Sequence, residues 1–97
     1  MAFLPGLVRA GELIKQASIM RYQAEKIALT KVPGGVIKSG ELEKEKGRLV
    51  WSFDIARPGT RNLTEVHVDA KNGHIVSVKT ETPAQEAAEA RQEKTKR

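Results

Sequence analysis

The segment from Glu65 to Lys79 constrains the fold more than any other part of the chain, because it has the pattern of a β-hairpin. Asn72-Gly73 is a turn signal between two segments in which apolar and polar residues alternate. A three-residue loop, 71–73, would place Gly73 in the left-handed region and form a bulge. The register that follows pairs Ala70 with His74, Val68 with Val76, Val66 with Val78, and Glu65 with Lys79. It gathers four valines on one face, and a shift by one residue would bury charges instead.

A second hairpin is predicted upstream, with strands over 36–45 and 48–56. A two-residue Lys46-Gly47 loop pairs Leu42 with Trp51 and Gly40 with Phe53. A three-residue loop would pair Glu41 with Trp51, so we expect the shorter one, which keeps apolar residues together. The absence of a side chain at Gly40 would then make room for the Phe53 ring.

Apolar residues recur at helical spacing between Leu13 and Ala28. They predict either one helix over 12–32 or a break near Ser18-Ile19, with a second helix starting at Met20 or Arg21. The segment 33–35, Pro-Gly-Gly, ends the helix because proline cannot continue the hydrogen-bond ladder. At the other end of the chain, Thr82-Pro-Ala-Gln has capping-box form and predicts a polar helix without an apolar stripe.

Together these elements predict an α+β fold in which one main helix packs on a four-stranded antiparallel meander sheet, with a short C-terminal helix as an option. The predicted division is a leader or extra helical segment over 1–18, a domain over 19–81 and a polar tail over 82–97. The predicted buried sheet face holds Leu42, Leu49, Trp51, Phe53, Ile55, Val66, Val68, Val76 and Val78. The helix residues expected to cover it are Ala24, Ile27, Ala28 and Val32. The other face is polar and mostly acidic, with Val50, Leu63 and Ile75 scattered on it.

Composition narrows the class of protein. The chain has 97 residues and no cysteine, which fits one small domain and excludes thiolate chemistry. The net charge is +5, but basic residues alternate with acidic ones, so we read the excess as solvated surface and expect no nucleic-acid partner. No stretch approaches the roughly 20 apolar residues that span a bilayer. The segment 1–9 is mostly apolar, but Pro5-Gly6 breaks it and it is too short for a complete signal peptide.

The residue types that carry chemistry do not group into a catalytic site. By strand parity His67 lies on the open face and His74 on the other, so they cannot share a metal and are read as lone surface histidines. Asp69 suits a hydrogen bond to the turn backbone better than a ligand. The predicted site therefore has no catalytic, cofactor or metal residue.

The acidic residues of the open face are the remaining candidates. Glu41, Glu43 and Asp54 are neighbours there, and paired carboxylates can do acid–base work. Exposed carboxylates without a pocket keep ordinary acidity, so a solvated face is the favoured interpretation and binding of a cation or basic peptide the alternative. A partner-binding face would consist of Glu41, Glu43, Asp54, Glu65 and His67.

Three segments, 23–35, 41–55 and 65–78, resemble the PepSY domain in their order and spacing, and the resemblance covers about 19–81. Such domains often have Ser or Thr where Met20 stands, so either the helix begins earlier here or its N-cap is absent. The resemblance implies a non-catalytic module outside the cytoplasm, periplasmic, secreted or beside a membrane segment. It leads us to expect an exported regulator that binds or inhibits a peptidase. The alternative is a protein- or ligand-binding module that uses the open face or an edge strand, the latter also a route to a homodimer.

Overall fold

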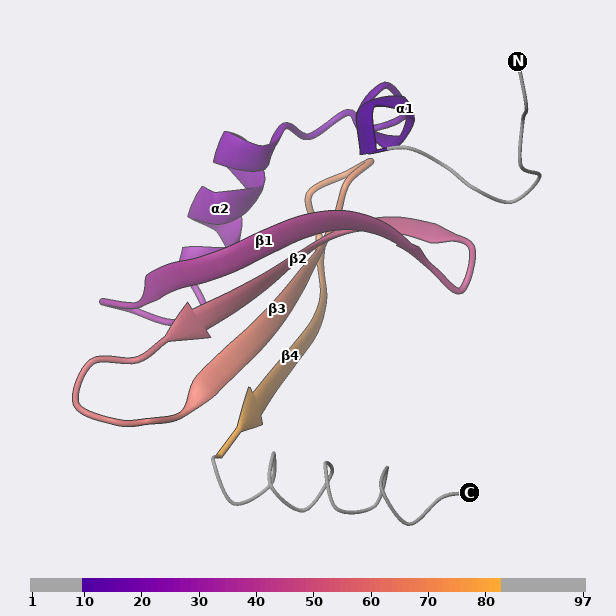
Figure 1. Cartoon of the computed structure of the whole chain (residues 1–97). Helices are drawn as coiled ribbons and strands as arrows, with labels where there is room; N and C mark the ends of the chain where they lie inside the picture. Colours follow the sequence, from indigo (N-terminus) through magenta and orange to yellow (C-terminus); the bar gives the residue numbers. More distant parts are fainter. Residues whose placement is uncertain (1–9, 83–97) are drawn as a thin grey trace, which may run out of the picture.

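The computed structural model describes residues 10–82 and shows two short helices and one sheet (Figure 1). The elements are α1 (Ala10–Ile14), α2 (Arg21–Leu29), β1 (Val36–Glu45), β2 (Arg48–Ala56), β3 (Leu63–Asp69) and β4 (Ile75–Glu81). The strands form a four-stranded antiparallel sheet in the order β1-β2-β3-β4, so the predicted meander is confirmed. The predicted C-terminal helix lies outside the described residues.

The helical region is broken between Ile14 and Arg21, which confirms the predicted option of a break near Ser18-Ile19. The amides of Ser18 and Ile19 both donate to the carbonyl of Ala70, each at 2.8 Å. The carbonyl of Ile19 accepts a hydrogen bond from the indole Nε1 of Trp51 at 2.7 Å. Backbone groups that bond to the sheet in this way cannot also continue a helix, so the option of one helix over 12–32 is wrong and α2, which follows the break, is the helix that packs on the sheet.

Helix α2 begins without a side-chain oxygen at its N-cap. Met20 occupies that position in extended conformation, and its amide donates to Oε1 of Gln23 at 2.9 Å. This is one half of a capping box, because the Met20 side chain makes no cap hydrogen bond in return. The Ser or Thr N-cap that the resemblance led us to expect is therefore absent, and the helix does not start earlier to replace it.

The hairpin of β1 and β2 has the predicted ends and the predicted register. Leu42 lies opposite Trp51 and Gly40 opposite Phe53. Lys46 and Gly47 both have positive φ, 51° and 79°, which is the geometry of a type I′ turn. A Cβ on Gly40 would lie 2.7 Å from two carbons of the Phe53 ring, so the predicted packing of ring against glycine is confirmed.

The hairpin of β3 and β4 corrects the predicted loop. The Asp69 amide donates to the His74 carbonyl and the Gly73 amide to the Asp69 carbonyl, both at 2.8 Å, so the loop holds the residues between Asp69 and His74. The predicted three-residue loop, 71–73, is therefore wrong, because the loop has one more residue and spans 70–73. A bulge makes up the difference: Val68 pairs with Ile75 and His67 with Ser77, which leaves Val76 without a partner. Beyond the bulge the predicted pairs return, as Val66 with Val78 and Glu65 with Lys79.

The core lies between the helices and one face of the sheet. Its buried residues are Leu13, Ala24, Ala28, Val32, Leu49, Trp51, Phe53, Ile55, Val66, Val68 and Ala70, with Ile27 and Leu42 packed against them. Fully burying a large apolar side chain contributes roughly 1.5–3 kcal/mol, so these residues can hold a small domain together.

Two valines predicted to lie in the core are exposed instead. Val76 is 39% exposed because the bulge removes it from the alternation, and Ile75 packs on the core in its place. Val78 keeps the predicted register but is 47% exposed. The reason is the position of α2, which packs mainly over β1, β2 and β3 and leaves the edge strand β4 uncovered.

Candidate functional site

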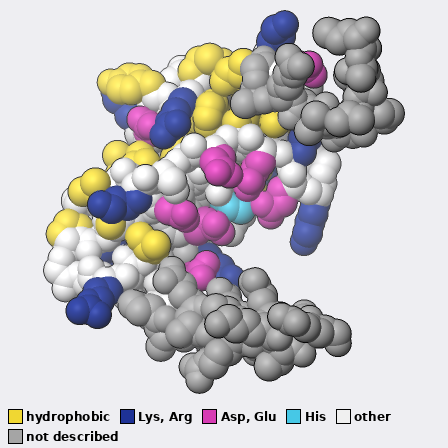
Figure 2. Space-filling model, in the orientation of Figure 1, with side chains coloured by type: hydrophobic (Ala, Val, Ile, Leu, Met, Phe, Trp, Pro, Cys, Tyr) yellow, Lys and Arg dark blue, Asp and Glu magenta, His cyan; other side chains and the backbone are white. Residues whose placement is uncertain are grey.

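The face of the sheet turned away from the helices collects acidic side chains from three strands. Figure 2 shows these side chains grouped around a histidine. We call it the acidic face; it comprises Glu41, Glu43 and Glu45 of β1, Asp54 of β2, and Glu65 and His67 of β3. Strand alternation places them there, since residues two apart point to the same side. The register adds that Asp54 lies directly opposite Glu65.

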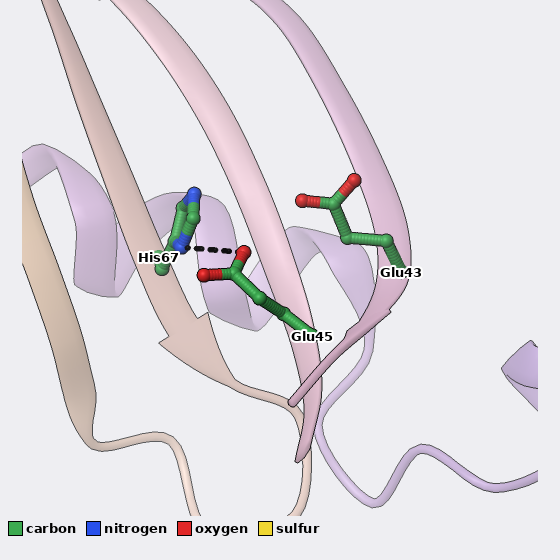
Figure 3. A group of neighbouring side chains, drawn as sticks. All are labelled: Glu43, Glu45 and His67. Atoms are coloured by element: carbon green, nitrogen blue, oxygen red, sulfur yellow. Dashed lines mark ion pairs between the residues drawn. The ribbon is translucent and has the colours of Figure 1, made fainter. Parts of the chain in front are cut away.

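His67 is the only buried residue among the six that define the acidic face. It is 8% exposed, and both ring nitrogens face carboxylates: Nδ1 is 3.4 Å from Oε2 of Glu45 and Nε2 is 3.4 Å from Oε1 of Glu65. The prediction of a lone surface histidine is therefore wrong. The Glu45 side chain extends from β1 across β2 to reach the ring (Figure 3), which strand parity alone does not reveal.

Glu43 joins this pair. One ligand-type atom from each of Glu43, Glu45 and His67 lies within 4.8 Å of the others (Figure 3). Sequence reasoning placed Glu43 and His67 on the face but missed Glu45. The signal was present, because Glu41, Glu43 and Glu45 follow one another at intervals of two along a strand.

The surroundings of Glu43 change its acidity. Burial raises the pKa of its carboxyl above the ordinary value of 4.5, and the carboxylates of Glu41, Glu45 and Glu65 raise it further. The imidazole of His67 acts in the opposite direction and lowers the pKa. The expectation that the carboxylates of this face keep ordinary acidity is thus wrong for Glu43, since a charged carboxylate is disfavoured where water is partly excluded.

A hollow adjoins His67 near the turn between β1 and β2. Its volume is about 330 Å³, and it is lined by Glu45, Lys46, Arg48, Val50, His67 and Val76. Val50 was expected as a scattered apolar residue on the open face. It lies there but is only 1% exposed, since Glu43 and Asp69 flank it on the neighbouring strands. The bulged Val76 supplies a second apolar wall.

The residues of the turn between β3 and β4 have structural roles. Oδ1 of Asp69 accepts hydrogen bonds from the amides of Lys71 at 2.7 Å and Asn72 at 3.3 Å, so the predicted bond to the turn backbone is confirmed. His74 is exposed in the same turn. Asp54 accepts a hydrogen bond from the Ser39 hydroxyl at 3.1 Å. It lies opposite Glu65, whereas His67 lies opposite Ser52.

The acidic face offers groups that interact favourably with positive charge. Carboxylates of three strands provide acceptors, and the single imidazole provides a nitrogen ligand or a proton carrier.

Within residues 10–82 no helix has the length and apolarity needed to cross a membrane.

The comparisons with known proteins identify the family. The family model described as peptidase propeptide and YPEB domain, PepSY, matches residues 22–79, from the first turn of α2 to Lys79 of β4. Neither the curated proteins nor the solved structures include a significant match to this chain. The matched segment is more than half of the chain and takes in the helix, both hairpins and the acidic face, and the chain therefore belongs to the PepSY family.

Proposed function

We propose that this protein is a non-catalytic, exported regulator that binds a peptidase and restrains its activity. The observation that carries the proposal is the match to a peptidase-propeptide domain over α2 and all four strands. The proposed contact surface is the acidic face, which no described element covers. We infer export because propeptide domains of this family belong to peptidases that act outside the cytoplasm.

Charge supports the choice of this face. The chain has a net charge of +5, yet the acidic face gathers five carboxylates, and the register adds Arg48 and Lys79 on the same side of the sheet, opposite Glu45 and Glu65. Complementary charge mainly raises the rate of association and fixes the orientation of the partners. The acidic face would therefore attract a basic surface beside the peptidase's cleft, and the complex should weaken as salt rises.

The direct test is inhibition of, and complex formation with, the exported metallo- and serine peptidases of the source organism. The variant that carries Glu41→Lys and Asp54→Lys reverses charge on the acidic face and should lose binding. The matched control carries Glu12→Lys and Glu25→Lys, which make the same change in net charge on the two helices. Absence of inhibition and of any complex with these peptidases would reject the proposal.

The exposed edge strand β4 favours a second candidate, a protein-binding module without a peptidase target. Val76 and Val78 are 39% and 47% exposed, and the outer edge of β4 has no neighbouring strand in the described sheet. Such an edge can accept an added strand from a partner or from a second copy. Light scattering coupled to gel filtration should then show a dimer that Val78→Lys converts to a monomer. A monomer at all concentrations would exclude self-association.

A further inference from the structure

The surroundings of His67 leave one of its ring nitrogens without a suitable partner. A neutral imidazole has one N–H donor and one lone pair, whereas both nitrogens face carboxylate oxygens, which only accept. Nε2 is buried and has no hydrogen-bond partner among the described residues. In a neutral ring, one nitrogen lone pair therefore faces a negatively charged carboxylate oxygen. Because His67 is only 8% exposed, water screens this repulsion poorly, and a positive charge at the imidazole would make the contact favourable.

The distances indicate what that charge is. Each nitrogen is 3.4 Å from its carboxylate oxygen. A charge-assisted N–H to carboxylate bond is shorter, at about 2.7–2.9 Å, so neither spacing is that of a tight bond between a protonated imidazole and a carboxylate. Two ligands on one tetrahedral Zn²⁺, each with a bond of about 2.0–2.1 Å, are about 3.3 Å apart. The separation between His67 and Glu45 matches the second geometry.

A third ligand is in place. Glu43 lies on β1, two residues before Glu45, and one of its carboxylate oxygens is within 4.8 Å of a ligand atom of Glu45 and of His67 (Figure 3). A Zn²⁺ ion between three such atoms would draw them together by small rotations of two glutamate side chains. The hollow beside His67, which is also lined by Glu45, would leave a fourth coordination position of such an ion open to water.

We propose that Nδ1 of His67 and the carboxylates of Glu43 and Glu45 form a zinc-binding site on the acidic face. Glu65 is the positioning residue, because its carboxylate faces Nε2 at 3.4 Å, and a shorter contact on metal binding would let it accept the Nε2–H hydrogen bond and hold the ring in the tautomer that leaves Nδ1 free. The nitrogen ligand favours Zn²⁺ over Ca²⁺ and Mg²⁺, which prefer oxygen. The site does not depend on a peptidase target.

Calorimetric titration of the full-length protein with zinc chloride tests the site. We expect one ion per chain and a rise in melting temperature on addition of zinc. His67→Gln and Glu45→Gln should each weaken binding by roughly tenfold or more, and Glu65→Gln by a smaller factor. Glu45 is an exposed residue, so its variant keeps the experiment meaningful if His67→Gln folds poorly.

Two control variants separate a built site from general attraction. His74→Gln removes the only other imidazole, and Glu41→Gln removes one negative charge from the same strand and face. Both should bind zinc nearly as well as the unmodified protein. If Glu41→Gln lost as much affinity as Glu45→Gln, or if Ca²⁺ competed as well as Zn²⁺, the binding would be diffuse electrostatic attraction and the proposal would fail.

Ring ¹⁵N spectra provide a readout that calorimetry lacks. Zinc should shift the resonance of Nδ1 of His67 and leave those of His74 in place. Equal responses of both histidines, or a response of neither, would overturn the proposal. So would spectra in which His67 binds a second proton and no metal, because the needed positive charge would then come from the ring itself.

Discussion

At the scale of single residues, the contact of Gly40 with Phe53 gives the clearest prediction. Gly40→Ala should lower the free energy of unfolding by about 1–3 kcal/mol, because its Cβ would meet a fully buried ring. Urea denaturation measures the change. In a double-mutant cycle Phe53→Leu should recover part of the loss, since leucine leaves space beside the new methyl group. Strict additivity of the two changes would show that the ring is not what opposes alanine.

The second residue-scale prediction concerns Glu43 and pH. Its pKa is raised above 4.5 in the folded protein, so the folded state holds this proton more firmly than the unfolded state does. This contribution to stability is therefore present at low pH and is lost as the pH rises through the pKa of the folded protein. Glu43→Gln should match the unmodified protein below about pH 4 and be the more stable of the two near pH 7.

Urea denaturation across this pH range, with a chelator present so that no metal ion contributes, measures the effect. The exposed Glu12→Gln is the charge-matched control. A variant less stable than the unmodified protein at neutral pH would contradict the assigned direction of the pKa shift.

At the scale of elements, the second hairpin depends on one side chain. Asp69→Ala removes two hydrogen bonds from the amides of Lys71 and Asn72, and should cost about 1–2 kcal/mol. Asp69→Asn keeps an acceptor oxygen and should cost clearly less. Thermal unfolding compares the two. If the alanine and asparagine variants lost equal stability, the negative charge of Asp69 beside Arg48 would contribute more to stability than the two turn hydrogen bonds.

The hairpins also show how far a sequence alone can go. Alternation fixes the register of Trp51 against Leu42, because every other choice buries charges. It does not choose between loops of three and four residues when a bulge follows, and here the bonds of Asp69 and the bulge at Val76 decided it. The helix break could not be settled either, because Ala70 and Trp51, which bond to the linker, are distant in the sequence.

The same limit applies to the candidate site. Parity assigns the acidic residues to one face, and it would have included Glu45. It says nothing of how far a long side chain reaches across a strand, so the contact of Glu45 with His67 and the burial of that histidine could not be predicted.

At the scale of the whole molecule, the hydrophobic core extends beyond the segment that the family model matches. Leu13 of α1 is 8% exposed and belongs to the core, although the match begins at residue 22. Leu13→Ala should therefore lower the free energy of unfolding by about 2–4 kcal/mol. Lys15→Ala, an exposed change next to the same helix, is the control. Similar small losses for both would mean that α1 does not fold together with the sheet.

The bond from the Trp51 indole to the Ile19 carbonyl has a practical consequence. Trp51 is the chain's only tryptophan, and it lies where the segment joining the helices meets the sheet. Its fluorescence thus reports on two events without any label, the burial of the ring and the docking of that segment. Because the ring is on the side of the sheet opposite the acidic face, a ligand bound there should leave its emission unquenched. A spectral change on binding would then signal movement within the domain.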